Sequence, residues 1–187
     1  MKKSAGFTLI ELMVVIAIAS VLMKLAAPSF KQLIQSNTIS SNVNNFLADM
    51  RYARSESVRR GGGVIMCRSD APEAASPVCG SGSGPGTNGW VSGWIIFHDV
   101  DGNGTRTALS TDPILRVQAP ITAIDSINES GTSTKFAFTA TGRLKLSGIT
   151  SFQFGSNSNY ANTVQRIVCV SVGGRARVAG DGLSSCT

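Results

Sequence analysis

The first residue that could do chemistry is a carboxylate inside an apolar run. From Phe7 to Ala27 the only charged residues are Glu11 and Lys24. A carboxylate near the centre of a membrane-spanning helix costs about 2.5–3.5 kcal/mol on insertion scales, so it usually has a partner and a function. Cleavage after Gly6 would create such a partner, because the α-amine of Phe7 would lie one helical turn before Glu11. We expect this amine to pair with Glu11 of its own chain or of a neighbouring subunit.

A second candidate is the stretch DVDGNG at residues 99–104, which is spaced like the first half of a calcium-binding loop. Asp99, Asp101 and Asn103 would supply oxygen ligands. The twelfth position of such a loop is normally Glu, but here it is Ser110. The same residues are typical of a β-turn that follows a strand. We therefore expect no metal and no cofactor.

A third candidate is the stretch GGRARV at residues 173–178. Residues 61–131 contain three basic and seven acidic residues, whereas residues 132–187 contain six basic residues and one acidic residue. This asymmetry indicates a basic C-terminal surface, on which Arg175 and Arg177 could contact phosphates. The alternative is that the two arginines only solvate the edge of a strand.

Four cysteines follow the apolar run, and an oxidising compartment would pair them. Their number allows three pairings. We favour Cys67–Cys79 with Cys169–Cys186, because both bonds are local and neither needs distant elements to meet. A zinc site is disfavoured, since the chain has no C-x-x-C motif and only one histidine, His98. With one histidine and no nucleophile in a recognisable motif, we expect that the protein is not an enzyme.

The elements that position these residues begin with the apolar run. Its 21 residues would span about 30 Å as a helix, which is the thickness of one bilayer core. Lys2 and Lys3 precede the run, so the positive-inside rule places the N-terminus in the cytosol and the rest across the membrane. A secretory signal peptide, cut within KLAAPSF at residues 24–30, is the competing interpretation.

The remaining sequence predicts an amphipathic helix followed by strands. Apolar residues recur at spacings of three and four from Ile39 to Met50, and the glycines at 61–63 are expected to end the helix. Short β-branched or aromatic stretches predict strands at 63–67, 93–99, 114–120, 135–142, 151–155 and 165–172. The Gly-, Ser- and Pro-rich connection at 68–89 is interpreted as a flexible surface loop within one globular domain.

The sequence GFTLIELMVVIAIASVLMKLAAPSF at residues 6–30 resembles the class III signal and N-terminal helix of type IV pilins and type II secretion pseudopilins. The resemblance implies that a prepilin peptidase cuts after Gly6 and methylates the amine of Phe7. It also implies that Glu11 attracts the amine of the next subunit during filament assembly. Pro28 falls where pilins commonly have a helix-perturbing proline, whereas Lys24 departs from a position that most members keep apolar.

The globular part is similar to the FimT/FimU minor pilins and GspH-type pseudopilins. The similarity lies in SESVRRGGGVIMC, GWIIFHDVDGNG, FAFTATGR and CVSVGGRARV. It implies an α+β type IV pilin fold, in which a long N-terminal helix packs on a C-terminal antiparallel β-sheet domain. In FimT-type members a G-R-x-R motif is linked to DNA binding during natural transformation, and Gly174, Arg175 and Arg177 match it.

Together these features predict a minor type IV pilin with three segments. They are a leader peptide at 1–6, a transmembrane and assembly helix at 7–30, and a periplasmic globular domain at 31–187. We expect a single-pass inner-membrane subunit that primes or caps a pilus. Its expected partners are prepilin peptidase, other minor pilins and the major pilin, with double-stranded DNA as a further candidate. The alternatives are a GspH-type pseudopilin of a type II secretion system and a DNA-uptake receptor.

Overall fold

The computed structural model describes residues 7–84, 87–107, 111–131, 133–155 and 159–186, apart from the side chains of residues 25–28. The predicted leader at 1–6 therefore lies outside the described residues. The chain divides into two compact units, Met1–Asn37 and Thr38–Thr187. Helix α1, Leu9–Arg60, begins in the first unit and ends in the second.

The first unit consists of the N-terminal part of α1, whose apolar side chains are exposed. Leu9, Ile10 and Met23 are each at least 70% exposed. Within the described residues, no single helix is long and apolar enough to cross a membrane. The segments Leu9–Lys24 and Ser29–Arg60 qualify together by length and composition, as a pair bent by 40°. The bend expected at Pro28 falls between these two segments.

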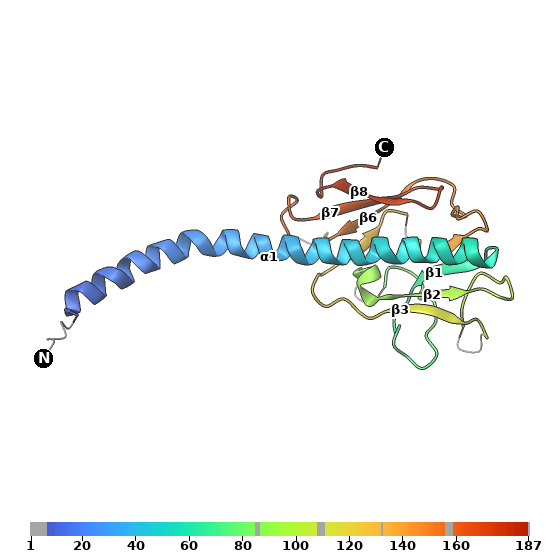
Figure 1. Ribbon diagram of the computed structural model, residues 1–187, viewed down its shortest axis with the longest axis horizontal. Coiled ribbons are helices and arrows are strands. Elements are labelled where there is room, and N and C mark those ends of the chain that lie inside the picture. Colours follow the sequence, from blue (N-terminus) through green and yellow to red (C-terminus); the bar gives the residue numbers. More distant parts are fainter. Residues whose placement is uncertain (1–6, 85–86, 108–110, 132, 156–158, 187) are drawn as a thin grey trace, which may run out of the picture. The chain divides into compact units, whose positions relative to one another are not determined.

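The second unit contains the end of α1 and two four-stranded antiparallel sheets. Figure 1 labels β1, β2 and β3 of the first sheet and β6, β7 and β8 of the second. The strands are β1 (Val64–Arg68), β2 (Trp94–His98), β3 (Ile114–Gln118), β4 (Ile127–Glu129), β5 (Lys135–Phe138), β6 (Thr150–Phe154), β7 (Arg166–Val170) and β8 (Ala176–Gly180). The first sheet has the order β3-β2-β1-β5 and the second has the order β4-β6-β7-β8. A short 3-10 helix, η2 (Trp90–Ser92), precedes β2.

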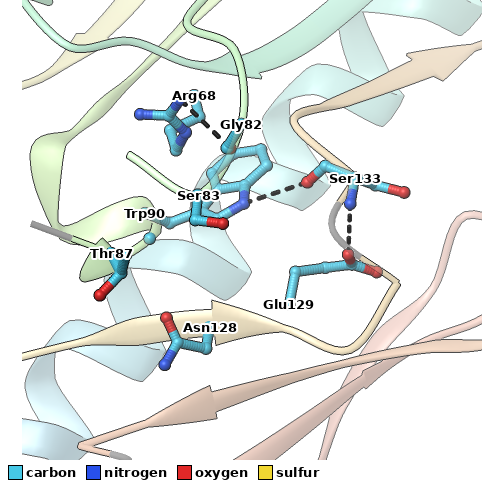
Figure 2. Close-up of a pocket in the computed structure, with 9 residues that line it drawn as sticks. Arg68, Gly82, Ser83, Thr87, Trp90, Asn128, Glu129 and Ser133 are labelled. Atoms are coloured by element: carbon cyan, nitrogen blue, oxygen red, sulfur yellow. Dashed lines mark hydrogen bonds between the residues drawn. The ribbon is translucent and has the colours of Figure 1, made fainter. Parts of the chain in front are cut away.

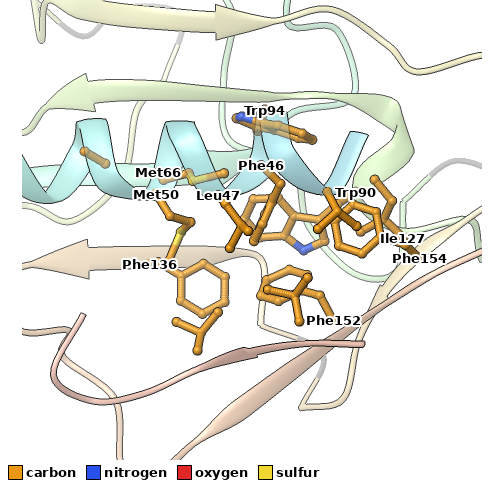
Figure 3. Close-up of a cluster of buried hydrophobic side chains, with 14 of the residues drawn as sticks. Phe46, Leu47, Met50, Met66, Trp90, Trp94, Ile127, Phe136, Phe152 and Phe154 are labelled. Carbon is orange, nitrogen blue, oxygen red and sulfur yellow. The ribbon is translucent and has the colours of Figure 1, made fainter. Parts of the chain in front are cut away.

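The core of the second unit forms around the apolar stripe of α1. Phe46 is fully buried, and its ring centroid lies 5.5 Å from that of Trp94 in β2 and 4.6 Å from that of Phe152 in β6 (Figure 3). One helix face therefore packs against both sheets. Aromatic pairs of this kind add about 0.5–1.5 kcal/mol each beyond the apolar area that they bury.

The C-terminus of α1 is fixed by the predicted glycines. Gly61 has a φ of +79°, and Gly62 donates its amide to the Ser57 carbonyl at 2.7 Å. This is a Schellman motif, in which a left-handed glycine directly follows the last helical residue. It turns the chain straight from α1 into β1, the second strand from the edge of the first sheet.

The six predicted strands are present, and the structure adds two strands that the sequence did not predict. The chain continues into β8, which pairs with β7 along its length, and a further short strand, β4, pairs with β6. Both additional strands lie at the edges of the second sheet. Their sequences, INE and ARVAG, lack a continuous apolar pattern, because β4 is only three residues long and no side chain of β8 is fully buried.

Candidate functional site

Glu11 is part of a capping box at the start of α1. Thr8 donates its backbone N–H to Glu11 Oε2 at 3.2 Å, and Glu11 donates its own N–H to Thr8 Oγ1 at 3.3 Å. The Thr8 hydroxyl also lies 3.1 Å from the Glu11 carboxylate. These reciprocal bonds satisfy backbone donors that a helix N-terminus leaves unpaired, and the carboxylate is favoured at the positive end of the helix dipole.

Phe7, the described residue of the predicted processing site, directly precedes this capping box in the chain. Phe7 is 85% exposed, whereas Gly6 lies outside the described residues. Thr8 is the residue that the sequence analysis missed. The pattern T-x-x-E directly before an apolar run was the available signal for it. Glu11 therefore has two features that a test must separate: it caps α1, and it places a negative charge beside the expected mature N-terminus.

Arg175 and Arg177 lie together on the outer face of the second sheet. Arg177 is opposite Cys169 in the pairing of β8 with β7, and Arg175 immediately precedes β8. Residues two apart on an extended chain point to the same face. Both arginines are exposed, and with Ile149, Ser171 and Cys169 they line a shallow groove. The structure thus brings the two predicted cations to one accessible surface at the sheet edge.

Gly174, unlike these two arginines, lies inside the turn between β7 and β8. It is buried, has a φ of +72°, and lies where a Cβ atom would come within 2.0 Å of the Gly142 carbonyl oxygen. Its amide donates to the Ser171 carbonyl at 2.9 Å, which closes the turn between β7 and β8. Gly174 is needed for the turn that presents Arg175, because a side chain there would be strained and would clash.

The four cysteines form the two local disulfides that their positions favoured. Cys67 is bonded to Cys79 and Cys169 to Cys186, with Cα–Cα distances of 5.5 and 5.6 Å. The first bond closes a loop after β1, and the second attaches the C-terminal segment to β7. Closing loops of this size stabilises the fold by about 3 kcal/mol each on the chain-entropy model.

The connection between β1 and η2 folds around a buried arginine that the sequence did not single out. Arg68 is 1% exposed, forms an ion pair with Asp70 and donates a hydrogen bond to the Ser81 carbonyl. It also donates to the Gly82 carbonyl at 3.4 Å, as Figure 2 shows. A Cβ atom at Gly80 would lie 2.8 Å from the guanidinium, so the glycines allow the loop to approach closely. The signal in the sequence was a charged residue at the end of an apolar strand, two residues before Asp70.

A small cavity lies beside Arg68, lined also by Trp90, Asn128 and Glu129 (Figure 2). Trp90 Nε1 donates to the Ser133 carbonyl at 3.3 Å, and Glu129 accepts the amide of Ser133 at 2.5 Å. Burial raises the pKa of Glu129, although the amides of Ser133 and Gly131 oppose that effect. These polar groups bond to the chain itself, so we interpret the cavity as part of the packing between the two sheets.

The fold brings Asp112, which lies outside the motif DVDGNG, close to two aspartates of that loop. Carboxylate oxygens of Asp99, Asp101 and Asp112 all lie within 4.8 Å of one another. Asn103 instead bonds within the loop, to the Asp101 carboxylate and the Thr105 amide. Ser110, which occupies the position where a calcium loop normally has Glu, lies outside the described residues.

Both the globular part of the chain and its N-terminal segment match known protein families. Residues 42–174 match the family model described as the type II transport protein GspH, and residues 1–23 match the prokaryotic N-terminal methylation motif. No curated protein sequence matches the chain.

Two crystal structures of the type IV minor pilin FimU from Pseudomonas aeruginosa have a similar fold. The structure in space group P21 has a TM-score of 0.57 and 20% identity, and the match covers 79% of this chain and 95% of FimU. The structure in space group P65 has a TM-score of 0.51 and 19% identity, with 78% and 98% covered. The α+β arrangement of one long helix on antiparallel sheets is therefore a type IV pilin fold.

Proposed function

Since the chain belongs to the family of the type II transport protein GspH, we propose that it is a minor type IV pilin that primes or caps pilus assembly. In this role it is a structural subunit and not an enzyme. A prepilin peptidase cuts it between Gly6 and Phe7, and it remains anchored in the inner membrane, with its globular domain in the periplasm, until other minor pilins and the major pilin join it.

The observation that carries this proposal is the position of Glu11. The N-terminal methylation motif covers residues 1–23, and Glu11 is the third residue of an apolar helix whose side chains are exposed. An exposed apolar helix can be buried by the equivalent helices of neighbouring subunits. The charge of Glu11 then favours the one offset between adjacent helices that places the α-amine of a neighbouring Phe7 beside it. This pairing would also remove the cost of a lone carboxylate in an apolar environment.

The first prediction separates the charge of Glu11 from its capping role. Glu11→Gln keeps a capping box, because Gln also accepts the Thr8 amide, but it removes the charge. Losing one partner of a buried ion pair costs about 3–5 kcal/mol, so incorporation into filaments should fall by about a hundredfold or more. Immunoblots of sheared filaments and of membranes, in a strain that makes the pilus, measure incorporation and processing.

Thr8→Ala is the matched control, since it removes the hydroxyl cap and leaves the carboxylate in place. This variant should be cut and incorporated, whereas Glu11→Gln should be cut and remain in the membrane. Normal incorporation of Glu11→Gln would show that the charge has no role in assembly.

A pseudopilin of a type II secretion system is the main alternative, and the family description favours it as much as a minor pilin. Deletion of the gene distinguishes the two. Loss of pili with normal protein secretion supports the minor pilin, and the reverse result supports the pseudopilin.

DNA binding during natural transformation is a second candidate function, favoured by the common face of Arg175 and Arg177. The second prediction tests it with the full chain in detergent micelles. Phosphate contacts carry no sequence information, so binding should not depend on the duplex sequence. Each phosphate contact adds about 0.9 to the slope of log affinity against log salt, so Arg175→Ala with Arg177→Ala should lower that slope by about 1.8.

Arg51→Ala with Arg59→Ala is the control for this measurement. It removes the same net charge from exposed positions of α1, and the salt slope should stay at the wild-type value. Gel shifts that show no wild-type binding even at about 50 mM salt would leave Arg175 and Arg177 as surface charge only.

A further inference from the structure

The end of β2 and the start of β3 bring three carboxylates together. Asp99 and Asp101 follow β2, whereas Asp112 lies two residues before β3, and oxygens of all three lie within 4.8 Å of one another. Asp112 is only 2% exposed. Within the described residues, none of the three forms an ion pair with a basic side chain. Like charges at this separation oppose folding unless something neutralises them.

Two carboxylate oxygens of this group accept no hydrogen bond from the described residues. Asp99 Oδ2 accepts the Gly104 amide at 3.0 Å, and Asp112 Oδ1 accepts the Val100 amide at 2.9 Å. Asp99 Oδ1 and Asp112 Oδ2 are buried and have no hydrogen-bond partner among the described residues. A buried carboxylate oxygen without a partner is costly, and so such atoms are normally paired or coordinate a metal.

The nearest cationic side chains bond to backbone carbonyls of this loop. Lys135 Nζ donates to the Gly104 carbonyl at 2.7 Å, and Arg106 Nε donates to the Asp112 carbonyl at 3.2 Å. Neither of these two cations is therefore paired directly with a carboxylate of the group.

We propose that Asp99, Asp101 and Asp112 bind a calcium ion. Carboxylate oxygens are the donors that hard cations prefer, and Ca²⁺ accepts six to eight oxygen ligands in flexible geometry. Asp112 supplies the distant carboxylate that the linear motif lacks at its twelfth position. Backbone carbonyls and water would complete the shell. The affinity expected for an extracellular module of this kind is on the order of 10⁻⁴–10⁻³ M.

The bound ion would stabilise one end of the first sheet. It would join the end of β2 to the start of the edge strand β3. Arg106 connects the same segment to the disulfide loop, because its carbonyl accepts the Cys79 amide at 3.2 Å and its side chain bonds to the Pro77 carbonyl. The inference does not depend on the proposed function, since it concerns ion binding by the folded domain.

The test measures calcium binding by the full chain in detergent micelles after treatment with a chelator. Calorimetry with CaCl₂ should give one binding event, and about 5 mM Ca²⁺ should raise the melting temperature seen by tryptophan fluorescence. Mg²⁺ at the same concentration should shift it less, because Mg²⁺ requires near-ideal octahedral geometry and loses its water reluctantly.

Asp112→Asn should weaken Ca²⁺ binding by about tenfold or more, because ligand charge sets affinity in such sites. Asn keeps an acceptor for the Val100 amide, so in chelator the variant should melt at or above the wild-type temperature. Asp101→Asn, at an exposed position, should also weaken binding and cannot disturb the core. Asp125→Asn removes a carboxylate that precedes β4 and is not part of this group, so it should leave Ca²⁺ binding unchanged.

Two results would overturn the proposal. One is the absence of both binding heat and a melting shift in the wild-type chain at this Ca²⁺ concentration. The other is a lack of selectivity: Ca²⁺ and Mg²⁺ stabilise the wild type equally, and Ca²⁺ stabilises Asp112→Asn and Asp101→Asn as much as the wild type.

Discussion

A single carboxylate, Asp49, connects α1 to the first sheet from inside the core. It is 4% exposed, accepts a hydrogen bond from Trp94 Nε1 at 2.8 Å, and lies 2.9 Å from the guanidinium of Arg116. Arg116 is half-exposed and also lies over the Tyr52 ring, at 5.3 Å from its centroid. Burial raises the pKa of Asp49 above its usual 3.8, while the Trp94 hydrogen bond and the Arg116 charge oppose that effect.

Asp49→Ala should destabilise the domain by about 1–3 kcal/mol near pH 7, because Trp94 Nε1 loses its acceptor. The raised pKa means that the folded protein binds a proton more readily than the unfolded chain. The wild type therefore gains stability relative to the variant as the pH falls through the folded pKa toward 3.8. Thermal unfolding of both chains at several pH values should show a loss that grows on acidification. A loss that shrinks would mean that pairing with Arg116 outweighs burial.

At the scale of elements, the sequence predicted α1 and the six strands that carry an apolar or aromatic pattern. It did not predict β4 and β8, because β4 has only three residues and β8 buries none of its side chains fully, so neither needs a run of apolar residues. The same limit applies to sites. Glu11 and the cysteines were found from local spacing, whereas Arg68 also bonds to Ser81 and Gly82, and Asp112 bonds to Val100, across loops of 12 residues or more. Only the pairing of strands and the folding of loops bring those partners together.

At the scale of the whole molecule, the two units carry different kinds of surface. The first unit exposes apolar side chains along α1 and places Glu11 at its start. The second unit buries its apolar side chains between α1 and the two sheets, and two disulfides tie down its loops. The first unit thus leaves an apolar surface uncovered, as the proposed filament subunit would require, whereas the second folds around its own core.

The measurement that tests this account most directly is mass spectrometry of the mature N-terminus, on chain isolated from membranes of a strain with an active prepilin peptidase. The account predicts a chain that begins at Phe7 with a methylated amine, since only cleavage there leaves the apolar helix and Glu11 in the mature protein. A chain that begins after Ala27 would have lost both, and would contradict the assignment as a filament subunit.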